Sequence, residues 1–173
     1  LVGSEIGIRD SSATVPNSTA TPATESSDGE LASVIYGPKS GAIVHDPTSN
    51  LIKQSPASVW ETNGNVTAVF YNPYSSDSGN FSYGFSFRDA SEAHFVIVSS
   101  NSVWEHYTFT AVDNKLVASG TISDFDATAN GTNQVGIIFV GDIGWLFVNN
   151  KLVTDFDLSD IQPAGDIRTV TGF

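Results

Sequence analysis

From Leu31 to the C-terminus, apolar side chains tend to recur at every second position. The run from Phe81 to Arg88 alternates aromatic residues with small or polar ones, and β-branched and aromatic residues dominate the neighbouring runs. Successive side chains of a strand point to opposite faces, so this period predicts strands with one buried face. Only Leu158–Gln162, after Asp157, could form a helical turn. The pattern therefore restricts the chain to an all-β fold.

Asparagine and glycine separate these runs, as in Asn149-Asn150 and Asn130-Gly131. Such residues tolerate the positive φ of tight hairpin turns. Many short strands at regular spacing predict an antiparallel sandwich of two sheets. The expected strands are Ser33–Tyr36, Ala42–His45, Val59–Glu61, Asn65–Tyr71, Phe81–Arg88, His94–Ser99, Val103–Thr110, Leu116–Thr121, Gln134–Val140, Gly144–Val148, Lys151–Asp155 and Asp166–Thr171. The alternation places in the core Val69, Tyr71, Phe81, Tyr83, Phe85, Phe87, Phe95, Ile97, Trp104, His106 or Tyr107, Phe109, Ile137, Phe139, Trp145 and Phe147.

Residues 1–30 have a different composition: they are rich in Ser, Thr, Ala and Pro and contain no aromatic residue and no lysine. A segment of this kind buries too little apolar surface to offset the entropy lost on ordering. We therefore divide the chain into an extended N-terminal arm or linker at 1–30 and a β-sandwich domain at 31–173. Within the arm, Val2–Arg9 is a candidate strand, because Val2, Ile6 and Ile8 are in phase.

The chain is acidic, with 7 Lys+Arg against 19 Asp+Glu and a formal net charge of −12. Nucleic acids and anionic membranes are bound chiefly through Lys and Arg, so both are excluded as expected partners. The absence of cysteine excludes disulfides and thiolate chemistry. No apolar run approaches the roughly 18 residues of a membrane span. Because methionine is also absent, we expect that a leader segment precedes this chain and that the protein is extracellular or at the cell surface.

Several motifs resemble those of concanavalin A-like (laminin-G-like) jelly-roll domains, in particular a branch of bacterial surface proteins. They are Tyr36-Gly37-Pro38, His45-Asp46-Pro47, Phe70-Tyr71-Asn72-Pro73-Tyr74, Ser82-Tyr83-Gly84-Phe85-Ser86-Phe87-Arg88 and Gly144-Trp145-Leu146-Phe147-Val148-Asn149. The resemblance covers residues 31–173 and implies a jelly roll. The superfamily includes lectins, adhesion modules and glycosidases, so it does not by itself assign an activity. The Glu-x-Asp-x-Glu pattern of its glycosidases is absent here, and we expect no enzymatic activity.

Domains of this resemblance continue past the position of Phe173 into a closing strand, so the sequence predicts an open sheet edge at the C-terminus. An open edge accepts an incoming strand. Val2, Ile6 and Ile8 of a neighbouring copy could fill it, which would assemble a secreted structural subunit head to tail into a filament or surface layer. The alternative is that the arm is a linker and the domain is an extracellular carbohydrate-binding or adhesion module.

Two kinds of side chain are candidate ligand contacts. Trp60 and Tyr74, each near a proline, are candidate exposed aromatics for stacking on a sugar ring. Two Asp-Phe-Asp motifs could supply oxygen ligands to Ca²⁺ as the one candidate cofactor, or could simply be solvated carboxylates that flank a buried Phe. Their acidic residues are Asp124, Asp126, Asp155 and Asp157.

Two further features are open to a structural or a functional interpretation. Arg88 is expected to form an ion pair with Asp89, Glu92 or a buried carboxylate. Asn-x-Ser/Thr sequons, the acceptor sites of N-glycosylation, would make the protein an extracellular glycoprotein if they are used. They begin at Asn17, Asn65, Asn80 and Asn130.

Overall fold

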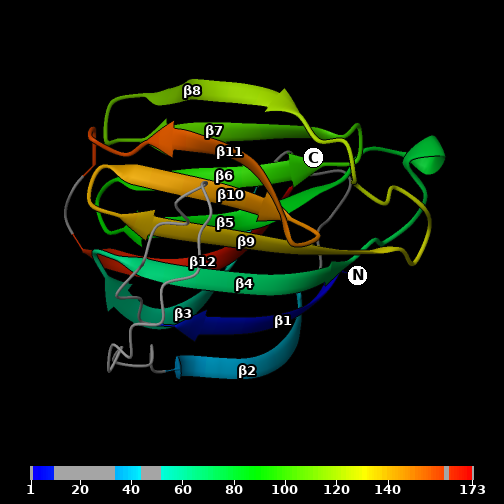
Figure 1. Ribbon diagram of the computed structural model, residues 1–173, viewed down its shortest axis with the longest axis horizontal. Coiled ribbons are helices and arrows are strands. Elements are labelled where there is room, and N and C mark those ends of the chain that lie inside the picture. The colour runs from blue at the N-terminus through cyan, green and yellow to red at the C-terminus, as the bar shows by residue number, and fades with distance from the viewer. Residues whose placement is uncertain (1, 10–33, 44–51, 162–163, 173) are drawn as a thin grey trace, which may run out of the picture.

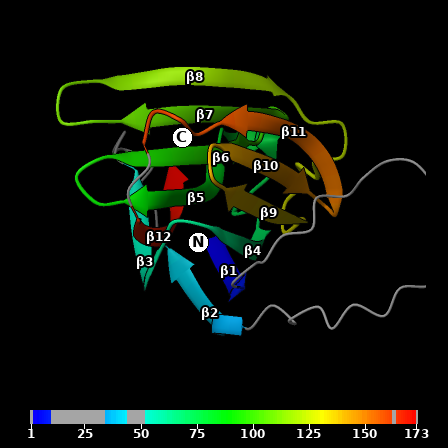
Figure 2. The same cartoon turned by 60° about the vertical axis from the view of Figure 1, so that its left-hand side comes forward.

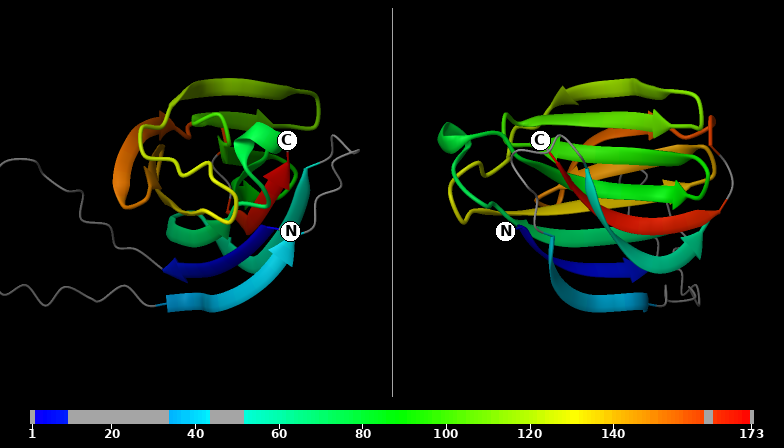
Figure 3. Two further views of the ribbon diagram at one scale, coloured as in Figure 1. Left: turned by 90° about the vertical axis from the view of Figure 1, so that its right-hand side faces the viewer. Right: turned by 180° about the vertical axis from the view of Figure 1, so that it is seen from behind.

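The computed structural model describes residues 2–9, 34–43, 52–161 and 164–172, which form two antiparallel six-stranded sheets packed face to face (Figures 1 and 2). Sheet A has the order β11-β10-β9-β4-β1-β2, and sheet B the order β3-β12-β5-β6-β7-β8. Figure 3 shows the two layers along the strands and from the side of sheet B. The strands are β1 (Val2–Arg9), β2 (Val34–Ile43), β3 (Lys53–Glu61), β4 (Gly64–Tyr71), β5 (Ser82–Asp89), β6 (Ala93–Ser99), β7 (Val103–Phe109), β8 (Asn114–Thr121), β9 (Thr132–Val140), β10 (Ile143–Val148), β11 (Lys151–Asp157) and β12 (Gly165–Gly172).

This architecture confirms the predicted all-β jelly-roll sandwich. A 3-10 turn at Ser76–Ser78 is the helical element of the described residues, and none of the described segments is a helix of membrane-spanning length and apolarity. Two predicted boundaries were wrong. The described parts of the two predicted segments, Val34–Tyr36 and Ala42–Ile43, belong to one strand, β2, and β3 begins at Lys53 rather than at Val59.

The predicted open edge at the C-terminus is wrong. β12, the last strand, is bonded to β5 on one side and to β3 on the other, so it is an interior strand of sheet B. The error has a clear origin. The prediction came from the resemblance, whose domains continue into a closing strand, and here β3, which begins at Lys53, already covers that side of β12.

The candidate strand at the N-terminus lies elsewhere, in sheet A of its own chain. β1 pairs with β2 and β4, and its register places Ile6 opposite Ala68 and Ile8 opposite Val66. Val2 lies opposite Ile43 of β2. Within the chain β1 and β12 belong to different sheets, and β12, which is bonded on both sides, offers no open edge to the β1 of a neighbouring copy. Residues 10–33 of the arm lie outside the described residues.

The core between the sheets contains most of the predicted aromatic residues, including Phe81, Phe85 and Phe87. On two strands, however, the residues that face the core are the alternate set to the one predicted. On β4, Phe70 is buried while Tyr71 is half exposed, and on β10 Leu146 is buried while Trp145 and Phe147 are only partly buried. Both strands carry apolar residues on both faces, so alternation alone did not decide which face is inside. The residues that correct the predicted core are Val66, Ala68, Phe70, Leu146 and Val148.

β6 is also apolar on both faces. Val96 and Val98 join the core between the sheets, whereas Phe95 lies on the outer face of sheet B. There the rings of Phe95 and Phe109 are 4.3 Å apart, and Ile97 packs beside them. Phe95, Ile97 and Phe109 were predicted as core residues and instead form this second cluster.

Arg88 is fully buried at one end of the sandwich. Its guanidinium donates to the carbonyls of Thr62 (3.1 and 3.2 Å), Leu158 (3.3 Å) and Ile161 (2.9 Å), and also to that of Gly141. The backbone φ of Arg88 is +52°, and β5 and β12 have a register shift beside it. This bulge turns inward a side chain that strict alternation would place outside. Arg88 thus binds backbone carbonyls, whereas Arg168 forms the ion pair with Asp89, at 3.4 Å.

Two histidines are buried next to this end of the core. His94 Nδ1 and His106 Nε2 are 3.0 Å apart, and His94 Nε2 is 3.2 Å from the carbonyl of Ile161. Because a carbonyl only accepts, His94 must donate from Nε2 and accept at Nδ1 from His106. Burial lowers the pKa of His94 to about 4 and that of His106 to about 3. Both side chains are therefore neutral in the folded protein near neutral pH.

We expect the free energy of unfolding to fall as the pH is lowered from about 6.5 to about 4. In that window the unfolded histidines bind protons and the folded ones do not, so acid favours the unfolded state. The loss between about pH 6.5 and about pH 5 should be on the order of 3 kcal/mol. Urea unfolding across this range measures it, above the range in which carboxylates titrate.

The control is His106→Gln, which keeps a donor toward His94 but does not titrate. This variant should lose about half of the pH dependence, whatever its stability near neutral pH. An unfolding free energy that is constant across the window would contradict the prediction.

Candidate functional site

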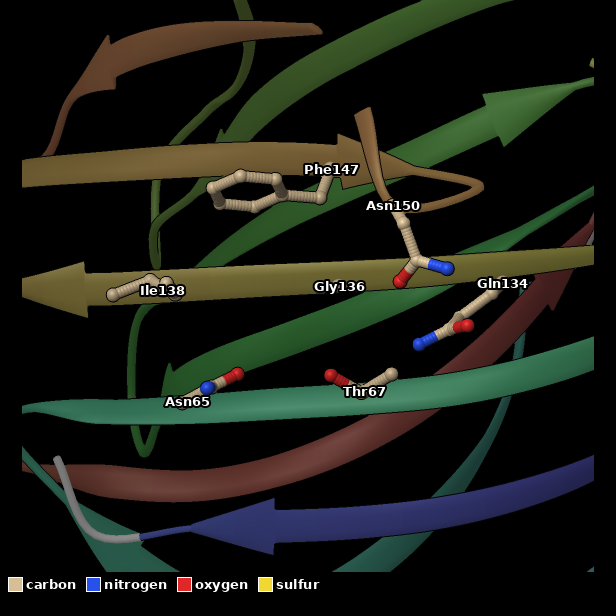
Figure 4. A pocket seen from close by; sticks show the side chains of 7 residues that line it. All are labelled: Asn65, Thr67, Gln134, Gly136, Ile138, Phe147 and Asn150. Atoms are coloured by element: carbon tan, nitrogen blue, oxygen red, sulfur yellow. The ribbon is translucent and has the colours of Figure 1, made fainter. Parts of the chain in front are cut away.

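A hollow lies on the outer face of sheet A, over the middle of β9 (Figure 4). Its volume is about 170 Å³. Three neighbouring strands, β4, β9 and β10, and the turn after β10 contribute its lining. We call it the Gly136 hollow, and it is lined by Asn65, Thr67, Gln134, Gly136, Ile138, Phe147 and Asn150.

Strand register explains why the hollow forms at Gly136. Gly136 lies directly opposite Thr67 of β4 on one side and Phe147 of β10 on the other. A side chain at the central position would fill the space between these two. A Cβ added to Gly136 would lie 3.3 Å from Thr67 Oγ1 and 3.8 Å from the Phe147 Cβ. Glycine therefore provides a floor without a side chain.

Side chains from both sides converge on this floor in Figure 4. Asn65 and Thr67 lie along β4, Gln134 and Asn150 lie at the end nearest the β10–β11 turn, and Phe147 lies along β10. Val66, between Asn65 and Thr67, is fully buried in the core. Because side chains alternate along a strand, Asn65 and Thr67 lie on the outer face of β4, where the hollow is.

The β10–β11 turn, which carries Asn150, is held by a network of amides. Asn149 donates from Nδ2 to the carbonyl of Asp124 (2.6 Å) and to Asn133 Oδ1 (3.0 Å), and its Oδ1 accepts from the Gln134 N–H (2.9 Å). Buried Asn133 in turn donates to the Tyr83 hydroxyl, at 2.8 Å. These contacts fix the turn against β9, so the end of the hollow that carries Gln134 and Asn150 is positioned before any ligand arrives.

The network continues to Asn72 on the far side of Tyr83. The Tyr83 hydroxyl donates to Asn72 Oδ1 (2.9 Å), and Asn72 Nδ2 donates to the carbonyls of Asp126 (2.6 Å) and Thr128 (2.8 Å). Burial raises the pKa of Tyr83, so its hydroxyl keeps its proton and remains a donor. The loop between β8 and β9 is thereby anchored to the core.

The chemistry of the hollow is polar but uncharged. Three amides and one hydroxyl offer both donors and acceptors, and none of the lining residues is ionisable. Phe147 and Ile138 add apolar surface beside them. Such a lining can bind a neutral molecule that has hydroxyl groups and an apolar face, and none of its side chains is a carboxylic acid, a histidine, a lysine or an arginine.

The two predicted stacking aromatics lie far apart. Trp60 is 59 % exposed and lies opposite Asp166 on β12. The rings of Tyr74 and Phe81 pack edge to face, and the Tyr74 hydroxyl donates to the carbonyl of Asn80, at 2.7 Å. Trp60 precedes β4 and Tyr74 follows it, and a strand of 8 residues spans roughly 25 Å. The structure does not bring them into one platform.

The predicted calcium ligands are likewise separated. Asp124 binds Lys151 at 2.9 Å, at the start of β11, and Asp157 is at the end of this 7-residue strand, about 20 Å away. Asp126 accepts from Thr128, and Asp155 lies opposite Trp145. Among the described residues, no group of three or more His, Asp or Glu could hold a metal ion. Phe156, between Asp155 and Asp157, is buried, as the alternative interpretation expects.

Of the four sequons, one coincides with the hollow. Asn65 and Thr67, the acceptor and the hydroxyl residue of the same sequon, both line it. A glycan on Asn65 would therefore occupy the hollow. Asn80 and Asn130 are exposed at loop positions, and Asn17 lies outside the described residues.

Sequence reasoning did not find the hollow. A signal existed, since Asn65, Thr67 and Gln134 are polar residues on strands at positions that alternate with core residues. Asn150 was noticed only as a turn residue, and Phe147 was assigned to the core. Without the pairing of β4 with β9 and β10, nothing in the sequence shows that these residues surround one glycine.

No protein family and no curated protein matches this sequence. Among solved structures, sheep galectin-11 in complex with glycerol is similar with a TM-score of 0.50, at 14% identity over 70% of this chain and 92% of that chain. The carbohydrate binding module CBM66 from Bacillus subtilis gives 0.47, at 12% identity over 69% and 91% of the two chains. A native glycosidic hydrolase gives 0.49, at 12% identity over 98% and 64%. At this identity, the likeness to galectin-11 is one of fold.

Asn149 and Asn150 offer a matched test of the turn, because both have positive φ, +51° and +65°. Asn149→Gly should lower the free energy of unfolding by about 2–3 kcal/mol, since three side-chain hydrogen bonds are lost. Asn150→Gly should be nearly neutral, because among the described residues its side chain has no hydrogen-bond partner. Urea unfolding of both variants measures the difference, and equal stabilities would contradict the network described above.

Proposed function

We propose that this protein is a non-catalytic carbohydrate-binding module, extracellular or at the cell surface, that holds a neutral sugar in the Gly136 hollow. The observation that carries the proposal is the lining itself. Amides from three segments surround a floor without a side chain, and an aromatic ring stands beside it. Specific small-molecule sites combine apolar surface with a few convergent polar groups in this way.

A sugar ring matches this lining in both respects. Its C–H groups form an apolar face that packs against Phe147, while its hydroxyls both donate and accept, as do the amides of Asn65, Gln134 and Asn150. Phosphates and other strongly anionic ligands fit poorly. The hollow has no Lys or Arg in its lining, and the chain carries a net charge of −12.

The absence of charge also supports a binding role over a catalytic one. Glycoside hydrolysis uses two carboxyl groups on opposite sides of the scissile bond. None of the residues that line the hollow carries a carboxyl group. We therefore propose recognition without bond cleavage at this site.

Phe147→Ala and Gly136→Val should each weaken glycan binding by about tenfold or more. The first removes the stacking surface, and the second fills the floor. Both changes lie on the outer face, and valine is favoured in strands, so the fold should persist. Glycan-array screening, followed by titration calorimetry with the best neutral ligand, measures the effect.

The matched control is Tyr107→Ala, which removes a partly buried aromatic from the outer face of the opposite sheet, beside Phe95. This variant should bind like the unmodified protein. If it loses binding while Phe147→Ala keeps it, the ligand site lies on sheet B. If the unmodified protein binds no neutral glycan, the proposal fails.

Self-assembly is a second candidate, favoured by one observation. β1 is hydrogen-bonded along both of its edges, to β2 and β4. Its covalent connection to the rest of the chain runs through residues 10–33. The β1 of another copy could occupy the same place, which would link the copies. However, pairing of β1 within its own chain does not weaken on dilution, whereas pairing between copies does, so its own β1 should prevail in dilute solution.

At micromolar concentration we therefore expect a monomer of 18.3 kDa by light scattering. Two differently tagged copies, mixed and refolded together, should not copurify. Copurification, together with a mass that grows with concentration, would instead support assembly by exchange of β1.

A further inference from the structure

A row of apolar side chains follows β10 on the same outer face as the Gly136 hollow. Trp145 and Phe147 are partly buried and Ile143 is 47 % exposed, whereas Gly144 and Leu146 between them are buried. Residues two apart on a strand lie on the same face, about 6.6 Å from each other along it. The row thus places a second aromatic ring one step beyond Phe147, outside the hollow itself.

Polar side chains follow the neighbouring strands in parallel. Phe147 shares a cross-strand row with Gly136 and Thr67, and Trp145 shares the next row with Ile138 and Asn65. Asn65 therefore lies at the end of the hollow toward Trp145. On the other side of Trp145 lies Asp155 of β11, which is exposed and can accept hydrogen bonds.

We infer that the Gly136 hollow is one subsite of a longer site along β10, and that a second sugar ring stacks on Trp145. The ligand class is then a linear neutral oligosaccharide rather than a single sugar. This inference rests on the proposed function. It follows from spacing, because one step along β10 is comparable to the length of one sugar unit in an extended chain.

The lining of the second row also sets the charge of the ligand. Asp155 beside Trp145 would repel a carboxylate or sulfate on the second ring, while it accepts from the hydroxyls of a neutral one. The first row is uncharged. Both rows thus select against acidic polysaccharides.

The experiment is a chain-length series by titration calorimetry. The probes are gluco-, manno-, galacto-, xylo- and fructo-oligosaccharides, from the monosaccharide upward. The unmodified protein should bind chains of two or more units about tenfold more tightly than the single sugar. Trp145→Ala should bind the single sugar normally and lose this gain, and Phe147→Ala should lose binding at every length.

Thermal unfolding of Trp145→Ala tests its fold, and Tyr107→Ala serves as the control for loss of an aromatic on an outer face. Equal affinity of the unmodified protein for one unit and for longer chains would overturn this inference alone. If Trp145→Ala still bound longer chains more tightly than the single sugar, that result would also overturn this inference alone. Absence of binding at every length would overturn the proposed function, and this inference with it.

Discussion

One end of the sandwich depends on the hydrogen bonds of a single buried group, the guanidinium of Arg88. It donates to backbone carbonyls of the β3–β4 turn, the β9–β10 turn and the segment after β11, so one side chain joins three connections. A buried charge is tolerated only when its hydrogen-bonding groups are satisfied, and these carbonyls supply the acceptors that the guanidinium needs. Gly165 allows the arrangement, because a Cβ there would lie 2.2 Å from the Arg88 carbonyl carbon.

The opposite end is held by the amides around Asn133 and the Tyr83 hydroxyl. The Gly136 hollow lies on strands that run between these two buried polar networks. Arg88 fixes the turns that precede β4 and β10, and Asn149 fixes the turn that follows β10. A site whose walls are held at both ends loses little conformational entropy when a ligand binds, which favours recognition of a defined shape.

The parts of the fold that were predicted correctly depend on strong local patterns. The run of Phe81, Tyr83, Phe85 and Phe87 has apolar residues on one face only, and all four are in the core. β4 and β10 carry apolar residues on both faces, and there the predicted phase was wrong. The candidate site was missed for the same reason, because Phe147 was assigned to the core.

By itself, the sequence determined the fold class, the positions of most strands, the acidic character of the surface and the absence of thiol chemistry, because these follow from local periodicity and composition. Only the tertiary structure decided which strands are neighbours. It made β12 an interior strand, inserted β1 between β2 and β4, and brought Thr67, Gly136 and Phe147 into one row. Strand pairing depends on contacts between residues far apart in the chain, and local periodicity does not show which residues make those contacts.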